Sequence, residues 1–307
     1  TSGDPYGDLQ HALDTMTRDA TNGDQINIKA GTAELLTAAI SLTTYGTTAI
    51  PAPLIFKGYT TVANDGGQCA IKVNATYRII NESTKDFIYF VDMRLYNTGS
   101  NTPGMQLDDY SGFINCKIDL GTGADAILIG NTAIFVNNHI TDVTGKLNII
   151  GGCISRNFFE DGVTNQFSAF AIDINSGTRQ EATVEHNIIS ISGSCVGIEV
   201  TDGCFIRNNS IYASGAATGQ GIRCSATSGR HFFDVSNNLI EGFSGTGGIG
   251  IRGGGEGAYV YQGNGVYDCT TEYSGSDLTD REMWGDPATN EILTASPFTD
   301  AANGDFS

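Results

Sequence analysis

Asparagine recurs through the middle of this chain at intervals of 19 to 30 residues, each time in the same local context. The context is an apolar residue, two variable positions, the Asn, one more variable position and a second apolar residue, as in Phe135, Asn138 and Ile140. The motif is centred on Asn138, Asn157, Asn187, Asn209, Asn238 and Asn264. A repeat of this length is typical of a solenoid in which each repeat forms one coil. Because the intervals vary while the motif is kept, insertions are expected between motifs.

A second pattern, a small residue followed by alternating apolar positions, precedes the Asn motifs. It occurs at Gly104–Leu107, Ala126–Ile129, Ala171–Ile174, Gly197–Val200, Gly221–Cys224 and Gly248–Ile251, with Leu147–Ile149 filling the remaining gap. Alternation over three or four residues indicates short strands with one side chain inward and the next outward. A single coil cannot cover its apolar side, but coils stacked about 4.8 Å apart bury a continuous core. The sequence therefore predicts an all-β parallel solenoid.

The recurring Asn is expected to have a structural role. Stacked side-chain amides can hydrogen-bond from coil to coil, and Asn tolerates the left-handed backbone of tight turns. In the first coil with the full pattern, Cys116 stands where the other coils have Asn. We expect a buried Asn ladder along one edge of the solenoid.

Three segments follow from these patterns. Residues 1–23 are predicted to form an N-terminal cap, in which Leu9, Ala12, Leu13 and Met16 lie on one face of a short helix that starts after Asp8. Residues 24–269 are predicted to form about ten coils, the earlier ones matching the pattern less strictly. Residues 270–307, which contain the only tryptophan, are read as a C-terminal cap or linker.

Composition excludes several classes of partner. The chain has 34 acidic and 16 basic residues and a formal charge of -18, so it lacks the basic surface that nucleic acids require. The same charge repels anionic membranes and anionic glycans unless a local basic site reverses it, which favours neutral glycans. No run of apolar residues is long enough to span a membrane. The seven cysteines show no metal-binding spacing and are expected to be small buried thiols, with one coil-to-coil contact such as Cys195 with Cys224, rather than a disulfide framework.

The strand and Asn motifs, together with the opening segment from Gly23 to Thr32, resemble the pectin-lyase-like superfamily. The resemblance covers most of the chain and includes proteins from bacteriophages and environmental bacteria. It implies a right-handed parallel β-helix with three short strands per coil and a capping helix, with the Asn at the turn between the second and third strands. The superfamily contains lyases, hydrolases, adhesins and inert virion proteins, so the resemblance implies a fold and leaves the activity open.

The outward positions of the first strands contain the candidate chemistry. In chain order these positions are Gln106, Leu128, Asn148, Asp173, Glu199, Arg223 and Gly250. Asp173 and Glu199 on adjacent coils could act as the acid and base of a glycoside hydrolase, or could hold a cation with Arg223 as the base of a lyase. Gln106 and Asn148 are candidate substrate contacts on the same face. The competing interpretation is a solvent-exposed ion pair on an open face, worth about 0 to 1 kcal/mol, and we favour it.

Other polar residues carry weaker signals. His139, His186 and His231 lack the spacing of metal ligands and are expected at the surface. Acidic residues at or near turns, Asp108, Asp109, Asp119 and Asp125, could share a Ca²⁺ ion, but the glycine-rich repeat of calcium-binding β-rolls is absent. The Trp-x-Asp-His type motif of pectate lyases and the paired aspartates of polygalacturonases are also missing from the sequence. We therefore expect no metal site and no cofactor, Ca²⁺ being the one ion left open.

These observations favour a non-catalytic surface solenoid that presents its faces to glycan or protein partners. By resemblance, it would be a bacteriophage appendage or capsid-surface protein, or a cell-surface adhesin, located on the virion or outside the cell. Resemblance also implies a homotrimer or assembly with other virion proteins, with cell-surface polysaccharide as a further partner. The alternative function is a polysaccharide lyase or glycoside hydrolase that acts along the first strands. Neither alternative includes a nucleic acid or a membrane as a partner.

Overall fold

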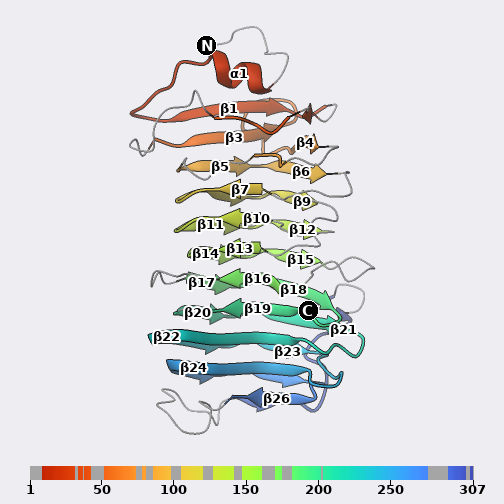
Figure 1. The fold of residues 1–307 in the computed structure, drawn as a ribbon. Helices are drawn as coiled ribbons and strands as arrows, with labels where there is room; N and C mark the ends of the chain where they lie inside the picture. Colours follow the sequence, from red (N-terminus) through yellow and green to blue (C-terminus); the bar gives the residue numbers. More distant parts are fainter. Residues whose placement is uncertain are drawn as a thin grey trace.

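A computed structural model of the chain is an elongated parallel β-solenoid with one short helix at its N-terminal end (Figure 1). The structure describes residues 9–31, 34–36, 38–42, 52–73, 78–80, 86–97, 105–119, 127–141, 147–160, 170–174, 182–201, 203–275, 290–301 and 305–306. The coils follow one another along the axis in chain order, so each strand pairs in parallel with strands of the neighbouring coils. No helix in these ranges is long and apolar enough to cross a membrane.

The strands form three parallel faces. The first face contains β7 (Met105–Leu107), β10 (Ile127–Ile129), β13 (Leu147–Ile149), β16 (Phe170–Ile174), β19 (Val196–Val200), the first parts of β22 (Gln220–Ser236) and β24 (Ile249–Gln262), and β26 (Thr271–Ser274). The second face contains β1 (Asp24–Lys29), β3 (Leu54–Tyr59), β5 (Ile88–Val91), β8 (Gly112–Ile114), β11 (Ala133–Val136), β14 (Gly152–Ser155), β17 (Ala182–Glu185), β20 (Cys204–Arg207) and the last parts of β22 and β24. The third face contains β2 (Glu34–Leu36), β4 (Cys69–Val73), β6 (Met93–Asn97), β9 (Lys117–Asp119), β12 (His139–Thr141), β15 (Phe158–Glu160), β18 (Ile188–Ser192), β21 (Ser210–Ser214), β23 (Leu239–Glu241), β25 (Gly265–Tyr267) and β27 (Glu291–Ile292).

The predicted fold class is confirmed, but the number of complete coils is lower than predicted. About six turns carry strands on all three faces, rather than ten. Before Met105, the described strands belong to the second and third faces, and the first face keeps only a parallel bridge between Ile40 and Ile80. The small-residue strand pattern of the first face also begins at Gly104, so the N-terminal coils lack the alternation that a first-face strand needs.

The interior is filled by side chains stacked in register from coil to coil. On the second face, Phe56 pairs with Phe90, Phe90 with Phe113, and Phe113 with Phe135. Their ring centroids lie 4.8, 5.4 and 5.7 Å apart in that order, and all four side chains have no exposed surface. The inward residues of the other two faces are mostly Ile, Leu and Val, whose branched side chains suit a pleated, buried surface. The core therefore extends as one column along the axis.

The N-terminal end is covered as predicted. Helix α1 (Leu9–Thr15) lies across the first coil, with Leu9, Ala12 and Leu13 buried and Met16 partly buried against the core (Figure 1). The proposed N-cap Asp8 lies outside the described residues. An uncovered first coil would expose unpaired strand edges and apolar side chains to water. The helix removes that exposure.

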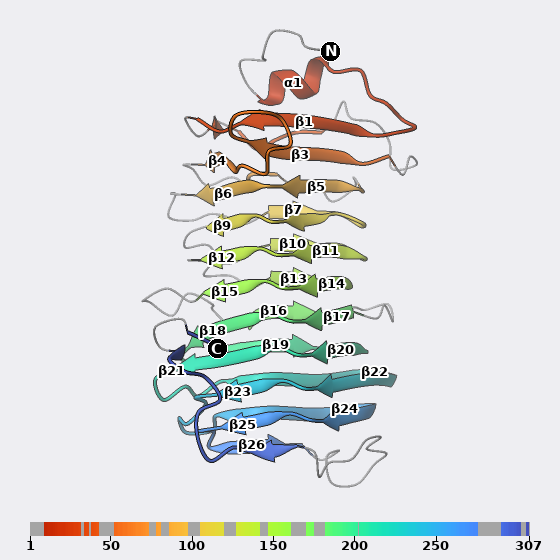
Figure 2. The same cartoon turned by 180° about the vertical axis from the view of Figure 1, so that it is seen from behind.

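The C-terminal segment continues the solenoid and then turns back along it. Strands β26 and β27 extend the first and third faces beyond residue 269, where the predicted coils stop. The last described residues then return along the third face toward β21 and β18, as both views show (Figures 1 and 2). Phe306 contacts Phe158 and Tyr212 there, with ring centroids 6.1 and 6.3 Å away. Trp284 lies outside the described residues.

Candidate functional site

The predicted column of outward side chains exists on the first face. Asn148 pairs with Asp173, Asp173 with Glu199, and Glu199 with Arg223 on successive strands. The next member is Arg252, which pairs with Arg223, and not Gly250 as the sequence pattern predicted. The correct alignment is shifted by two residues. An alternating strand can slide by two positions without changing which side chains face the core.

The two carboxylates of this column are buried, which corrects the expectation of an open face. Asp173 is 3% exposed and Glu199 is 4% exposed. Arg223 donates a hydrogen bond through its Nε to Glu199 Oε2, and its guanidinium lies 5.3 Å from the centroid of the Phe170 ring. Of the two side chains in this ion pair, only that of Arg223 reaches the surface, with 29% of it exposed.

Burial also shifts the pKa of Glu199. Loss of hydration raises the pKa of Glu199, the hydrogen bond and charge of Arg223 lower it, and the nearby Asp173 carboxylate raises it. The net direction is upward. Burial is the largest of these contributions to the pKa of Glu199.

The two candidate substrate contacts lie on the same face, where Asn148 is next to Asp173 in the column and Gln106 is three strands away from Asp173. Gln106 accepts a hydrogen bond at Oε1 from the Arg78 guanidinium. Asn148 is half-buried between Leu128 and Asp173. The groove described below contains neither residue, and it contains none of the three candidate catalytic residues.

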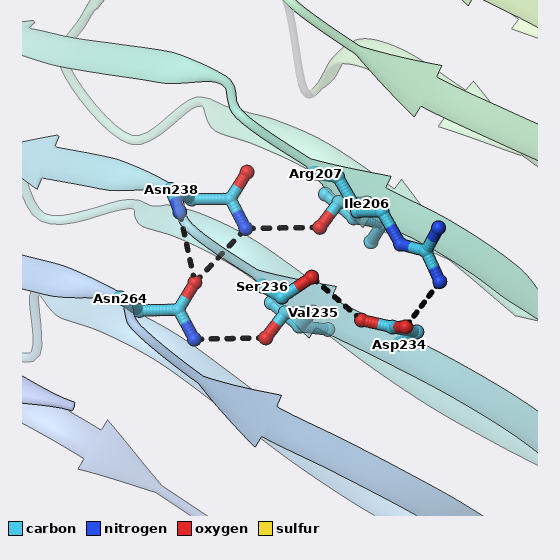
Figure 3. Close-up of polar contacts among 7 residues, drawn as sticks. All are labelled: Ile206, Arg207, Asp234, Val235, Ser236, Asn238 and Asn264. Carbon is cyan, nitrogen blue, oxygen red and sulfur yellow. Dashed lines mark hydrogen bonds and ion pairs between the residues drawn. The ribbon is translucent and has the colours of Figure 1, made fainter. Parts of the chain in front are cut away.

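The Asn ladder is confirmed at all six predicted positions. In each step, the Oδ1 of one Asn accepts hydrogen bonds from the backbone N and the Nδ2 of the Asn one coil earlier, at 2.8 to 3.0 Å. The Nδ2 group also donates to a backbone carbonyl oxygen. Asn238 donates to the oxygen of Ile206 and Asn264 to that of Val235 (Figure 3). The same view shows Arg207 paired with Asp234 on the second face, beside the ladder.

The ladder extends by one member at each end. Asn290 continues it after Asn264 with bonds of 3.0 and 2.9 Å, a position that sequence reasoning missed. At the other end the backbone N of Cys116 donates to Asn138 Oδ1 at 2.9 Å. Because each amide has its hydrogen-bonding groups used, the ladder fixes the turn between the second and third faces in the coils from Cys116 to Asn290.

The residue before each ladder position from Cys116 to Asn238 adopts a left-handed backbone. The values of φ are 55° at Asn115, 57° at Asn137, 57° at Arg156, 55° at His186, 54° at Asn208 and 55° at Asn237. Two of these side chains also bond from coil to coil, Asn137 Nδ2 to Asn115 Oδ1 at 3.0 Å and Asn115 Nδ2 to Asp92 Oδ1 at 2.7 Å. We call this series the outer row. The sequence signal for it was weak, because the residue types differ and only the backbone conformation is shared.

A shallow groove of about 450 Å³ runs along this edge. It is lined by Gln68, Asn115, Cys116, Lys117, Asn137, Asn138, His139, Arg156, Asn157, Phe158, His186 and Ile188. Outer-row side chains form one wall. The other wall is the first residue of each third-face strand, where Lys117 pairs with His139 and His139 with Phe158. The ladder lies between the two walls, so its coil-to-coil hydrogen bonds hold the floor of the groove.

One wall presents a flat ring pair. The imidazole of His139 stacks on the ring of Phe158 with centroids 5.0 Å apart and planes 14° apart, and its Nε2 lies 2.7 Å from Glu160 Oε2. His139 and His186 both line the groove; His139 is partly exposed and His186 is exposed, in agreement with the expectation that they lie at the surface. His231 differs from that expectation: it is 8% exposed, because β22 brings it beside Phe233.

The structure gives no support for a metal site in the residues it describes, where no group of three or more candidate ligands comes together. Asp109 accepts hydrogen bonds from Asn131 N at 2.6 Å and from Asn131 Nδ2 at 3.2 Å, so its carboxylate joins the turns of two adjacent coils. Asp125 lies outside the described residues. All seven cysteines are free thiols, five of them buried.

Comparison of the chain with protein-family models and with curated proteins found no match to either.

Proposed function

We propose that this protein is a non-catalytic solenoid that binds a glycan in the groove beside the Asn ladder. The observation that carries the proposal is the combination of groups on the groove walls: a stacked ring pair, side-chain amides and cations. Aromatic rings pack against the C–H faces of sugars, and amides both donate to and accept from hydroxyl groups. These are the few well-placed polar groups beside an apolar surface that ligand sites use.

The position of the groove supports the proposal. The ladder holds the floor in one conformation, and the left-handed turns hold the outer row at the spacing of the coils. A site that is already ordered loses less conformational entropy on binding. A groove that crosses several coils also suits a linear polymer that lies along the axis, since each coil adds two wall residues.

The wider setting of the proposal rests on the resemblance to the pectin-lyase-like superfamily. On that basis we propose a virion appendage, a capsid-surface protein or an adhesin, acting at the virion surface or outside the cell. A side-by-side homotrimer is part of the same proposal. Sedimentation of the full-length protein across micromolar concentrations tests it, and a monomer throughout would count against it.

The binding proposal is tested with a panel of soluble polysaccharides, using retardation in gels that contain each polymer. Phe158→Ala removes the ring that His139 stacks on, and we expect its affinity for the bound polymer to fall about tenfold. Phe232→Ala is the matched control, because Phe232 is 43% exposed and lies on β22, outside the groove. Retardation of Phe158→Ala equal to that of the parent, or no retardation by any polymer, contradicts the proposal.

A second function, cleavage of a polysaccharide on the first face, is favoured by one observation. Glu199 has a raised pKa and lies in register with Asp173, which is the arrangement of a general acid beside a second carboxylate. The test is incubation with the same panel, with and without Ca²⁺, followed by assays for new reducing ends and unsaturated products. Activity that disappears in Glu199→Gln and Asp173→Asn, with both variants folded, would establish cleavage in place of simple binding.

A further inference from the structure

The groove concentrates positive charge on a strongly acidic molecule. The chain as a whole carries a formal charge of -18. Lys117 and Arg156 nevertheless both line the groove, and neither forms an ion pair with any residue that the structure describes. The Glu160 carboxylate close by is held by His139 at 2.7 Å. The two cations are therefore available to a ligand.

We propose that the ligand of this groove is an acidic polysaccharide, one that carries carboxylate or sulfate groups. The proposal rests on the proposed glycan-binding function and names the class of glycan. It reverses the expectation from net charge, which favoured neutral glycans. The two cations would touch the ligand directly, whereas the carboxylates on the far faces are more distant from it. At physiological ionic strength the screening length is about 8 Å, so charges on the far faces contribute little at the groove.

The geometry also defines the spacing of charge on the ligand. Lys117 is on the third-face wall at β9, and Arg156 is on the outer row immediately before Asn157. Because β9 pairs with β12 and β12 with β15, the two side chains are two coils apart. Two rungs correspond to about 10 Å along the axis. The coil between them contributes the uncharged amide of Asn137 and the ring of His139. The groove thus fits a chain with acidic groups about 10 Å apart and hydroxyl or amide groups between them.

Each wall offers the contact that such a chain needs. The guanidinium of Arg156 can hold a carboxylate or sulfate through two parallel hydrogen bonds, and Lys117 supplies a compact charge. Gln68 closes one end, where its Nε2 donates to the backbone oxygen of Asn115 at 3.1 Å.

The experiment compares acidic polymers with neutral derivatives of the same backbone. The probes are hyaluronan, alginate and dextran sulfate, against carboxyl-reduced hyaluronan, carboxyl-reduced alginate and dextran. We expect at least one acidic polymer to bind about tenfold or more tightly than its neutral partner. In the variant Lys117→Gln/Arg156→Gln this preference should disappear. Arg156→Lys, which keeps the charge, should retain most of it.

The control variant, Lys29→Gln/Lys57→Gln, makes the same change of net charge on the second face, where β1 pairs with β3. It should bind as the parent does. Equal binding of acidic and neutral polymers, or a preference that survives Lys117→Gln/Arg156→Gln, overturns the acidic-ligand proposal while glycan binding itself stands. Absence of binding to every polymer overturns both proposals.

Discussion

The side-chain amide of Asn187 donates a hydrogen bond of 3.0 Å to Oδ1 of Asn209, one coil further along the solenoid. Asn187 Oδ1 in turn accepts two bonds from Asn157, at 3.0 Å from the backbone N and 2.9 Å from Nδ2. Asn187 is 1% exposed, so water cannot replace these partners. Each ladder amide thus joins three consecutive coils.

We therefore expect Asn187→Leu to destabilise the protein by roughly 1 to 3 kcal/mol, because the substitution leaves buried donors and acceptors without partners. Chemical denaturation of variant and parent measures the difference. Asn208→Gly is the control: Asn208 is exposed with φ 54°, a backbone conformation that glycine adopts freely. Equal stabilities of Asn187→Leu and the parent would contradict the structural role of the ladder.

Glu199 should make stability depend on pH. Its pKa is raised in the folded state, chiefly by burial, above the ordinary value of 4.5. The folded protein then binds more protons than the unfolded chain, so this contribution is fully present below pH 4.5 and is lost as pH rises through the raised pKa. Glu199→Gln cannot titrate. The stability of the parent relative to this variant should fall as pH rises from 4 to 7, as measured by denaturation, and a constant difference would contradict the assignment.

The thiols should react slowly in the folded protein. Burial raises the pKa of Cys116 to about 12 and that of Cys269 to about 11, and it also raises the pKa of Cys204 and Cys224. Since the thiolate is the reactive form, Ellman's reagent at neutral pH should modify the two partly exposed thiols, Cys153 and Cys269, before any other. All seven should react rapidly once the chain is unfolded. Rapid native modification of a third thiol would show that the core opens locally.

The returning C-terminal segment should depend on Phe306. Its ring meets those of Phe158, Tyr212 and Phe298, and it is the last described aromatic contact of the segment with the third face. Phe306→Ala should therefore increase hydrogen exchange and protease cleavage within residues 290–306, with little change in melting temperature. Phe205→Ala, which changes a ring on the second face, is the control. Unchanged protection in Phe306→Ala would show that other contacts hold the segment.

The fold was predictable because the residues that build it repeat. The ladder Asn and the inward apolar residues must meet their equivalents one coil away, so the same residue type recurs and the period becomes visible. Asn290 was not predicted as a ladder position because Pro287 occupies the first apolar position of its motif. Arg252 was not predicted as the next member of the outward column. The first-strand pattern is also matched, two residues out of register, by Ile249, Gly250 and Ile251.

The candidate sites were less predictable, since they depend on contacts between residues that do not repeat. The sequence placed Asp173 and Glu199 on adjacent coils but gave no measure of what covers them, so their burial was missed. Each groove wall combines different residue types from successive coils, such as Asn137, Arg156 and His186 on the outer row. These residues share only their left-handed backbone conformation, which the three-dimensional structure reveals and the sequence does not.

The unequal coil lengths described above allow the two sides of the solenoid to change independently. Asn138 and Asn157 are 19 residues apart and Asn157 and Asn187 are 30 apart, yet their amide bonds are 3.0 and 2.9 Å long. Extra residues are therefore absorbed in the connections away from the ladder. Selection could lengthen those connections, or duplicate whole coils, and leave the ladder edge with the same pitch. In such a lineage the loops would diverge from protein to protein while the number of binding positions along the groove grew one coil at a time.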